Sequence, residues 1–268
     1  MRRLLTCAGA ILLMLPFLSS RPTAAEDATT KRKAPGAEEF DRLVKEFNSK
    51  RAQAAKAYAA ATTEREKELA KAQEPKLDNY TRPLLALAEQ HPHDKFAVDA
   101  LIWVVQRAAP GPDAERALDA LYRDHLDSQE MGRVATLLVY SGCERIEERL
   151  RSLLSKSPHH DVQGLACISL ARCLKMKPES TSAPSQADTD KCNHEAEALL
   201  QRVADQYGDV DSRGTKLKDA VAGELHEIHE LSIGKPVPEI AGEDVHGKPF
   251  KLTDYRGKVV MLDFWGHW

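Results

Sequence analysis

Histidine and glutamate gather in one short run of this 268-residue chain, HEIHE, from His226 to Glu230. A zinc-peptidase helix needs histidines at positions i and i+4, so that both imidazoles face one ion. Here the second histidine, His229, comes at i+3, and Glu230 holds i+4. The run therefore favours a solvated helix face, with a weak metal site formed by His226, His229 and Glu230 as the alternative. We expect the chain to bind no metal and no other cofactor.

Cysteine is the other residue type that could do chemistry, yet no pair of cysteines has metal-ligand or redox spacing. Cys7 lies near the N-terminus, apart from the others. Cys167 and Cys173 are six positions apart, which on a helix separates them in angle and height, so a disulfide between them is not expected. Two alternatives stay open: a bridge from Cys173 to Cys192 across a loop, or separate half-buried thiols at Cys143, Cys167, Cys173 and Cys192.

The N-terminus is expected to be a secretory signal peptide over residues 1–25. Arg2-Arg3 precedes an apolar run, LLTCAGAILLMLPFL, which is too short to span a bilayer comfortably. Thr23-Ala24-Ala25 then offers small residues for cleavage. An exported protein of the periplasm or cell envelope follows, with a membrane anchor through the uncleaved segment as the alternative. Residues 26–37 are polar and are expected to form a tether.

Residues 38–232 are expected to form a helical-repeat domain. Phe40, Leu43, Val44 and Phe47 recur at the spacing of one helix face, and the pattern continues to about Gln73 as one long helix or two in tandem. Four similar short loops then recur along the chain, and each loop is flanked by an amphipathic helix on both sides. They are EQHPHD near residue 91, RDHLDS near 125, SKSPHHD near 157 and DQYGDVD near 207.

The first three loops recur with a period of about 33 residues, which is typical of helix hairpins stacked as in tetratricopeptide-like or HEAT-like proteins. The fourth loop comes late because residues 177–190, KPESTSAPSQADTD, form a low-complexity insert. The paired histidines of two loops, in HPHD and PHHD, are expected to have loop-capping and surface roles rather than to bind a metal. The second helices are expected to have N-caps at Asp94, Ser128, Asp161 and Thr215. The predicted fold is mainly α.

The composition changes near residue 234, where an α/β segment is expected to begin. His246-Gly247 separates two short strand candidates and suits a hairpin turn, since glycine readily adopts positive φ. Val259–Leu262 is a continuous apolar run, typical of a parallel strand that is covered on both faces. This core strand is expected to end at Phe264, so that the segment holds a β-hairpin and one core strand.

The segment 234–268 resembles the opening of the thioredoxin-like redoxins, the group of AhpC/TSA peroxiredoxins and TlpA-type thiol–disulfide reductases. The resemblance lies in turn residues, strand pattern and terminal aromatics that agree in order: Gly234, Pro236 and Pro238, then Asp244–Lys248, Phe250–Leu252, Asp254–Lys258 and Phe264–Trp268. It implies a truncated thioredoxin-like domain from 234 to 268. The helical region carries no such resemblance.

In that family the residue after this tryptophan is the first cysteine of a Cys-X-X-Cys pair, which exchanges disulfides through a mixed disulfide. The N-terminus of the next helix lowers the pKa of that cysteine. The resemblance therefore places the nucleophile directly after Trp268 and gives this chain no catalytic residue, only the residues that flank the site. These are Phe264, Trp265, Gly266, His267 and Trp268.

The function that the resemblance implies is an exported thiol–disulfide oxidoreductase or peroxiredoxin-like protein with an N-terminal helical-repeat domain, inactive as given. Its partners would be a protein thiol or disulfide, or a peroxide, and a protein bound by the helical repeats. The alternative is a helical-repeat binding scaffold with a vestigial redoxin segment. A net charge of −3 excludes a general nucleic-acid binder, which needs a basic face.

A selenocysteine at position 269 would explain a chain that stops directly before the nucleophile, because its codon, UGA, is read as termination. A true stop or a frameshift are the alternatives. The DNA beyond codon 268 distinguishes them.

Overall fold

The computed structural model of the chain describes residues 35–177, 185–231, 236–263 and 265–266. The expected signal peptide, residues 1–25, and the expected tether as far as residue 34 lie outside the described residues. None of the described helices is long and apolar enough to cross a bilayer.

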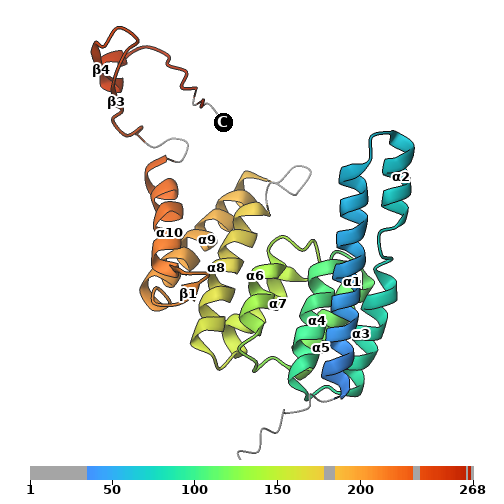
Figure 1. Ribbon diagram of the computed structural model, residues 1–268. Helices are drawn as coiled ribbons and strands as arrows, with labels where there is room; N and C mark the ends of the chain where they lie inside the picture. The colour runs from blue at the N-terminus through green and yellow to red at the C-terminus, as the bar shows by residue number, and fades with distance from the viewer. Residues whose placement is uncertain (1–34, 178–184, 232–235, 264, 267–268) are drawn as a thin grey trace, which may run out of the picture. The chain divides into compact units, whose positions relative to one another are not determined.

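Helices make up most of the described chain, which confirms the mainly α prediction (Figure 1). They are α1 (Pro35–Ala60), α2 (Glu64–Ala72), α3 (Asp78–Gln90), α4 (Lys95–Ala108), α5 (Pro112–Asp124), α6 (Met131–Leu138), α7 (Ile146–Lys156), α8 (His160–Met176), α9 (Gln186–Gln206) and α10 (Leu217–His226). Two short antiparallel sheets pair β1 (Asp211–Ser212) with β2 (Thr215–Lys216) and β3 (Ala241–Glu243) with β4 (Pro249–Lys251). A π-helical turn, η1 (Glu227–Leu231), follows α10, and a 3-10 turn, η2 (Leu252–Tyr255), follows β4.

Each of the four predicted loops lies between two helices: α3 and α4, α5 and α6, α7 and α8, and α9 and α10. The two helices contact each other in the first, third and fourth of these units, whereas α6 packs mainly on α8 and makes smaller contacts with α7 and α4. Leu101 of α4, Val134 of α6 and Leu170 of α8 are buried in one apolar cluster that continues through the helices. A second cluster joins α8, α9 and α10 around Leu200 and Val221. Neighbouring units thus supply the core that a single hairpin lacks.

Polar ties join successive units at the spacing of the predicted period. The Thr81 hydroxyl of α3 donates to Asp113 of α5 at 2.5 Å, across 32 positions of sequence. Arg133 of α6 reaches Asp99 of α4 at 3.1 Å, across 34 positions. Arg149 of α7 reaches Glu115 of α5 at 2.8 Å, again across 34 positions. Equivalent helices are therefore held in register from unit to unit; which named repeat family they follow stays a prediction.

The N-terminal helical region is two helices packed side by side rather than one long helix. The break falls at Thr63, whose hydroxyl accepts the N–H of Glu66 while the Glu66 carboxylate accepts the N–H of Thr63. This reciprocal cap starts α2, and Lys71 of α2 then lies 5.6 Å from the Tyr58 ring of α1. Helix α1 begins at Pro35, inside the expected tether, since proline suits the first turn of a helix.

Helix starts differ from the sequence-based expectation at several positions. Asp94 is the residue before α4 as expected, but its side chain makes no capping hydrogen bond. Ser128 is not the N-cap of α6, which begins at Met131 after Glu130; the Ser128 hydroxyl accepts the Glu130 N–H at 3.2 Å in the preceding turn. Asp161 lies inside the first turn of α8, because His159 is the extended residue before that helix. Thr215 lies in β2, because residues 211–216 form a hairpin that was not expected. Helix α9 begins at Gln186, inside the expected low-complexity insert, because the Ser185 hydroxyl accepts the N–H of Asp188 at 3.1 Å. The central part of that insert, 178–184, lies outside the described residues.

Candidate functional site

The hairpin predicted around His246-Gly247 forms, and one carboxylate organises its turn. Strands β3 and β4 pair antiparallel with Gly242 opposite Phe250. Asp244 Oδ1 accepts the N–H groups of His246, at 2.8 Å, and Lys248, at 3.0 Å. Gly247 has φ +76°, a conformation that disfavours residues with a side chain. The local sequence Asp-Val-His-Gly-Lys is thus sufficient to set this turn.

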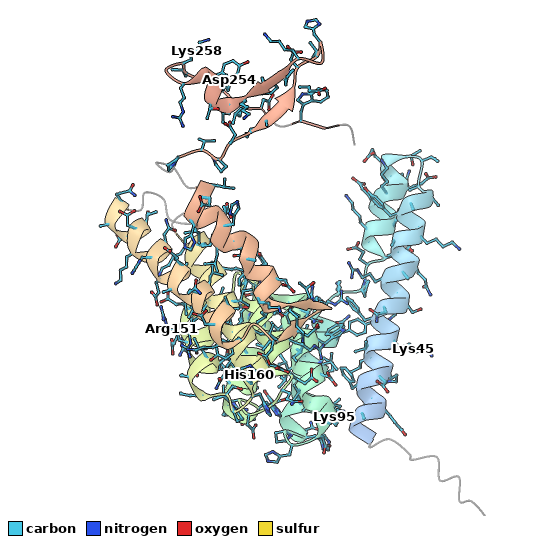
Figure 2. The ribbon with its side chains drawn as sticks, turned by 90° about the vertical axis from the view of Figure 1, so that its left-hand side faces the viewer. Lys45, Lys95, Arg151, His160, Asp254 and Lys258 are labelled. Atoms are coloured by element: carbon cyan, nitrogen blue, oxygen red, sulfur yellow. The ribbon has the colours of Figure 1, made fainter. Side chains whose placement is uncertain are left out.

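A second carboxylate ties the segment before the hairpin to the turn after it. The Thr253 N–H and hydroxyl donate to the two oxygens of Glu239, at 3.1 and 2.5 Å. The Leu252 N–H donates to the Ile240 carbonyl at 2.9 Å. At the start of η2, Asp254 Oδ2 accepts the Lys251 N–H at 2.9 Å; Figure 2 labels Asp254. The chain from 236 to 258 is therefore fixed by its own polar contacts.

The bonds from Thr253, its hydroxyl first, hold the pKa of the Glu239 carboxyl below its ordinary value of about 4.5. A carboxyl with a lowered pKa in the folded state stabilises that state above its ordinary pKa and loses this contribution as the pH falls through the lowered value. We expect the Thr253 amide resonance to shift with a midpoint below the ordinary glutamate range in an NMR pH titration. Thr253→Val keeps the amide donor and should move the midpoint upward; an unchanged midpoint would contradict the role of the hydroxyl.

The predicted core strand Val259–Phe264 is extended but is not part of a sheet. Side-chain exposure alternates along it: Val259 and Met261 are 103% and 93% exposed, whereas Val260 and Leu262 are 42% and 46% exposed. Val260 and Leu262 face a hollow of about 340 Å³ whose other walls come from residues 236–239 and 252–256. No other described strand pairs with this run, so the covered strand that is typical of its apolar pattern does not form among the described residues.

The residues expected to flank the redox site are only partly described. Trp265 is 76% exposed, and Gly266 beside it is also exposed. Phe264, His267 and Trp268 lie outside the described residues. Residues 236–263 include no cysteine. This segment therefore contributes structural residues next to the expected redox site but no thiol nucleophile.

The four cysteines that the structure describes are free thiols in the helical region, and Cys173 and Cys192 are not bridged. Burial raises the pKa of Cys167 to about 11, and it also raises the pKa of the Cys143 and Cys173 thiols. The thiolate is the reactive form, so a raised pKa makes these thiols weak nucleophiles at neutral pH. Cys143, Cys167 and Cys173 therefore lack the lowered pKa of a redox cysteine.

We therefore expect Cys143 and Cys167, which are both buried, to react with a disulfide reagent far more slowly in the native protein than after unfolding in urea. The measurement is mass-mapped labelling at pH 7 over time, with the partly exposed Cys192 as the internal reference. Labelling of Cys167 as fast as Cys192 in the native state would contradict the burial of this thiol.

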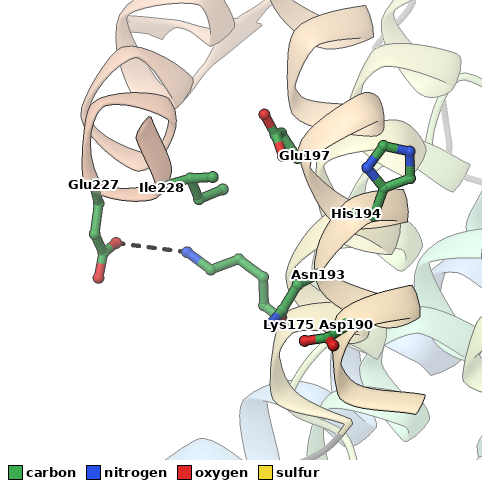
Figure 3. A pocket seen from close by; sticks show the side chains of 7 residues that line it. All are labelled: Lys175, Asp190, Asn193, His194, Glu197, Glu227 and Ile228. Atoms are coloured by element: carbon green, nitrogen blue, oxygen red, sulfur yellow. Dashed lines mark ion pairs between the residues drawn. The ribbon is translucent and has the colours of Figure 1, made fainter. Parts of the chain in front are cut away.

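The HEIHE run does not form a metal site among the described residues, where no three potential ligands gather. His226 ends α10, and His229 lies in η1, with its Nε2 2.9 Å from a Glu197 carboxylate oxygen of α9. A neighbouring pocket of about 360 Å³ lies between α8, α9 and η1. There Lys175 pairs with Glu227 at 3.5 Å (Figure 3). The run ties η1 to α9 rather than presenting two imidazoles to one ion.

A segment of this chain is similar to thiol–disulfide oxidoreductases. The protein named thiol-disulfide oxidoreductase ResA of Geobacillus thermodenitrificans (strain NG80-2) is 45% identical over 38 residues, which are 14% of this chain and 22% of that protein. ResA of Bacillus cereus (strain ATCC 10987 / NRS 248) is 39% identical, and ResA of Bacillus thuringiensis subsp. konkukian (strain 97-27) is 44% identical, each over 46 residues, 17% of this chain and 27% of the relative.

The chain thus spans about a quarter of the length of these relatives, 22% to 27%. No family model matches the chain, and no solved structure is similar to it. The ResA similarities support the thioredoxin-like resemblance at the level of the redoxin family. The subgroup, peroxiredoxin or TlpA-type reductase, stays a prediction.

Sequence reasoning missed the Glu239–Thr253 contact, which joins positions 14 apart. The sequence pattern in this region drew attention only to Pro236 and Pro238. These prolines do not indicate that the Glu239 carboxylate accepts a hydrogen bond from the Thr253 hydroxyl. The Asp244 turn, in contrast, carried a clear signal in the Asp-to-Gly spacing.

Proposed function

We propose that residues 234–268 open a thiol–disulfide oxidoreductase domain, with the reactive Cys-X-X-Cys pair directly after Trp268. The observation that carries the proposal is the similarity to ResA proteins over 38 to 46 residues, taken together with the redoxin-like order of motifs in residues 234–268. The name of those relatives favours disulfide exchange over peroxide reduction. The helical region, residues 38–232, would precede this domain in an exported protein of the cell envelope.

The described geometry fits the beginning of such a domain. The β3–β4 hairpin and η2 are fixed by Asp244, Glu239 and Asp254 before any further chain is added. The run 259–263 has unpaired backbone among the described residues, and Val259 and Met261 are exposed. Fully burying each of these side chains contributes about 1.5–3 kcal/mol. Flanking strands and a covering helix would supply the partners that the run lacks, and the strand end is where α/β folds carry their sites.

The test is an insulin-reduction assay with dithiothreitol as the reductant. Protein that ends at Trp268 should give only the uncatalysed rate, whereas protein translated from the gene through its following codons should reduce insulin. Serine in place of the first cysteine, or selenocysteine, after Trp268 should abolish this activity. Serine at the helical Cys143, Cys167, Cys173 and Cys192 should leave it intact. Activity of the chain that ends at Trp268, or of the nucleophile variant, would contradict the proposal.

A protein-binding scaffold is the second candidate function for the helical region. The repeated ties at 32 and 34 positions favour it, because they hold successive units in a fixed register over which an extended partner can bind.

A further inference from the structure

A groove of about 480 Å³ crosses three successive units of the helical region. Its walls come from the C-terminal end of α4, from α6 with the residues that follow it, from α8, and from the turn between β1 and β2. The second helices of neighbouring units lie in contact along this face, α4 with α6 and α6 with α8. A groove that runs across stacked second helices suits an extended segment rather than a compact small molecule.

The apolar part of the groove is formed by Pro110, Leu137 and Tyr140. Tyr140 is 75% exposed, although most large apolar side chains of the helical region are buried. Tyrosine offers a rigid ring and a polar tip, and exposed aromatic side chains of this kind are common anchors in protein interfaces.

The charged part of the groove is basic. Arg172 and Arg213 line it, and no carboxylate is among the described residues that do. Arg172 donates from Nε and Nη2 to Glu224 Oε1, at 3.0 and 2.7 Å, so its charge is partly offset. Arg213 is exposed and makes no ion pair with a described residue. The lining of the groove is therefore positively charged, whereas the whole chain has a net charge of −3.

The backbone at Arg213 gives a second, independent observation. Arg213 and Gly214 form the two-residue turn between β1 and β2, with φ values of +56° and +86°. Asp211 Oδ1 holds the turn by accepting the Gly214 N–H at 2.8 Å. Asparagine, aspartate or glycine is preferred at the first of these positions, because a long side chain is disfavoured at positive φ. The turn thus places the Arg213 side chain at the edge of the groove, in a backbone conformation that does not by itself favour arginine.

We propose that this groove binds an extended peptide segment of a partner protein, in which a carboxylate lies beside an aliphatic or aromatic residue. Arg213 pairs with the carboxylate, and Tyr140 and Leu137 contact the apolar side chain. Nucleic acid is the less favourable occupant, since it requires many cationic contacts and the groove offers two guanidiniums, of which one is offset by Glu224. The inference concerns the helical region alone and does not depend on the redox proposal.

The first step of the test is selection from a random peptide library displayed on phage, with the full chain immobilised. The expected result is enrichment of sequences that carry Asp or Glu next to Leu, Ile, Val, Phe or Trp. The enriched peptide is then labelled with fluorescein, and its affinity for the chain is measured by anisotropy. Absence of enrichment, or enrichment of basic sequences, would overturn the proposal.

Arg213→Gly separates binding from folding. Glycine is favoured at positive φ, so thermal stability should stay the same or rise, while the affinity for the peptide should fall about tenfold with loss of the charged contact. Tyr140→Ala should also weaken binding, whereas Tyr58→Ala, a matched change of an exposed tyrosine on α1, should not. Unchanged affinity in Arg213→Gly and Tyr140→Ala, or preference for a labelled oligo-dT over the peptide, would refute the groove assignment. Failure of insulin reduction would leave these results unaffected.

Discussion

Replacing Trp103 by alanine is expected to lower the free energy of unfolding by about 3–5 kcal/mol, the usual cost of removing a buried tryptophan side chain. Trp103 of α4 is 7% exposed. Its ring meets the Phe47 ring of α1 edge to face, with centroids 5.0 Å apart, and the Arg107 guanidinium lies 5.7 Å from it. The substitution removes one of the contacts that join α1 to the repeat units; Phe47 also meets the Tyr80 ring of α3, with centroids 5.2 Å apart. Urea unfolding followed by far-ultraviolet circular dichroism measures the change without relying on tryptophan fluorescence.

Trp103→Phe is the matched control. The buried indole nitrogen of Trp103 has no hydrogen-bond partner among the described residues, so loss of its N–H removes no bond there. Phenylalanine keeps an aromatic ring against Phe47, and we expect a loss of only about 1 kcal/mol. Equal losses for the two variants would show that the ring contact with α1 does not stabilise the fold.

Replacing Arg149 by alanine is expected to lower the free energy of unfolding by about 3 kcal/mol. Its side chain is 6% exposed and bonds Glu115 at 2.8 Å, Asp119 at 2.9 Å and the Glu144 carbonyl at 2.9 Å. Removing one partner of a buried ion pair leaves the other charge partly desolvated and unpaired, which is the costly part. The loss should appear in urea titrations at neutral pH.

Arg82→Ala provides the comparison for an exposed pair. Arg82 and Asp78 are 2.9 Å apart on the surface of α3, with side chains 70% and 67% exposed. Exposed pairs of this kind contribute about 0.5 kcal/mol or less. If Arg149→Ala cost no more than Arg82→Ala, the Arg149 contacts would not hold α5 and α7 in register.

The helix pairs could be predicted from the sequence because their signals are local. Apolar residues recur on one face of each helix, and loops such as EQHPHD interrupt the pattern wherever a unit turns. The ties that fix the register between units could not be predicted, since Arg149 has several acidic residues at comparable sequence separations and only the packing selects Glu115. The β1–β2 hairpin was missed because arginine is an unusual first residue for a two-residue turn and because two-residue strands carry almost no alternation.

The same distinction between local signals and contacts of distant residues applies to the candidate site. The Asp244-to-Lys248 turn was predictable, because a carboxylate and a glycine at this spacing determine it locally. Whether Val259–Leu262 pairs with another strand could not be predicted. A β-strand needs a hydrogen-bonded partner strand, and an apolar run does not indicate which segment provides it. Its alternating exposure nevertheless retains the two-residue period of a strand.

The most direct measurement for the central claim is the DNA sequence beyond codon 268. We predict that the codon after Trp268 encodes the redox nucleophile, that a cysteine codon follows three positions later, and that thioredoxin-like sequence continues. A different residue at codon 269 with no cysteine pair, or unrelated sequence beyond it, would contradict the claim that residues 234–268 open a thiol–disulfide oxidoreductase domain.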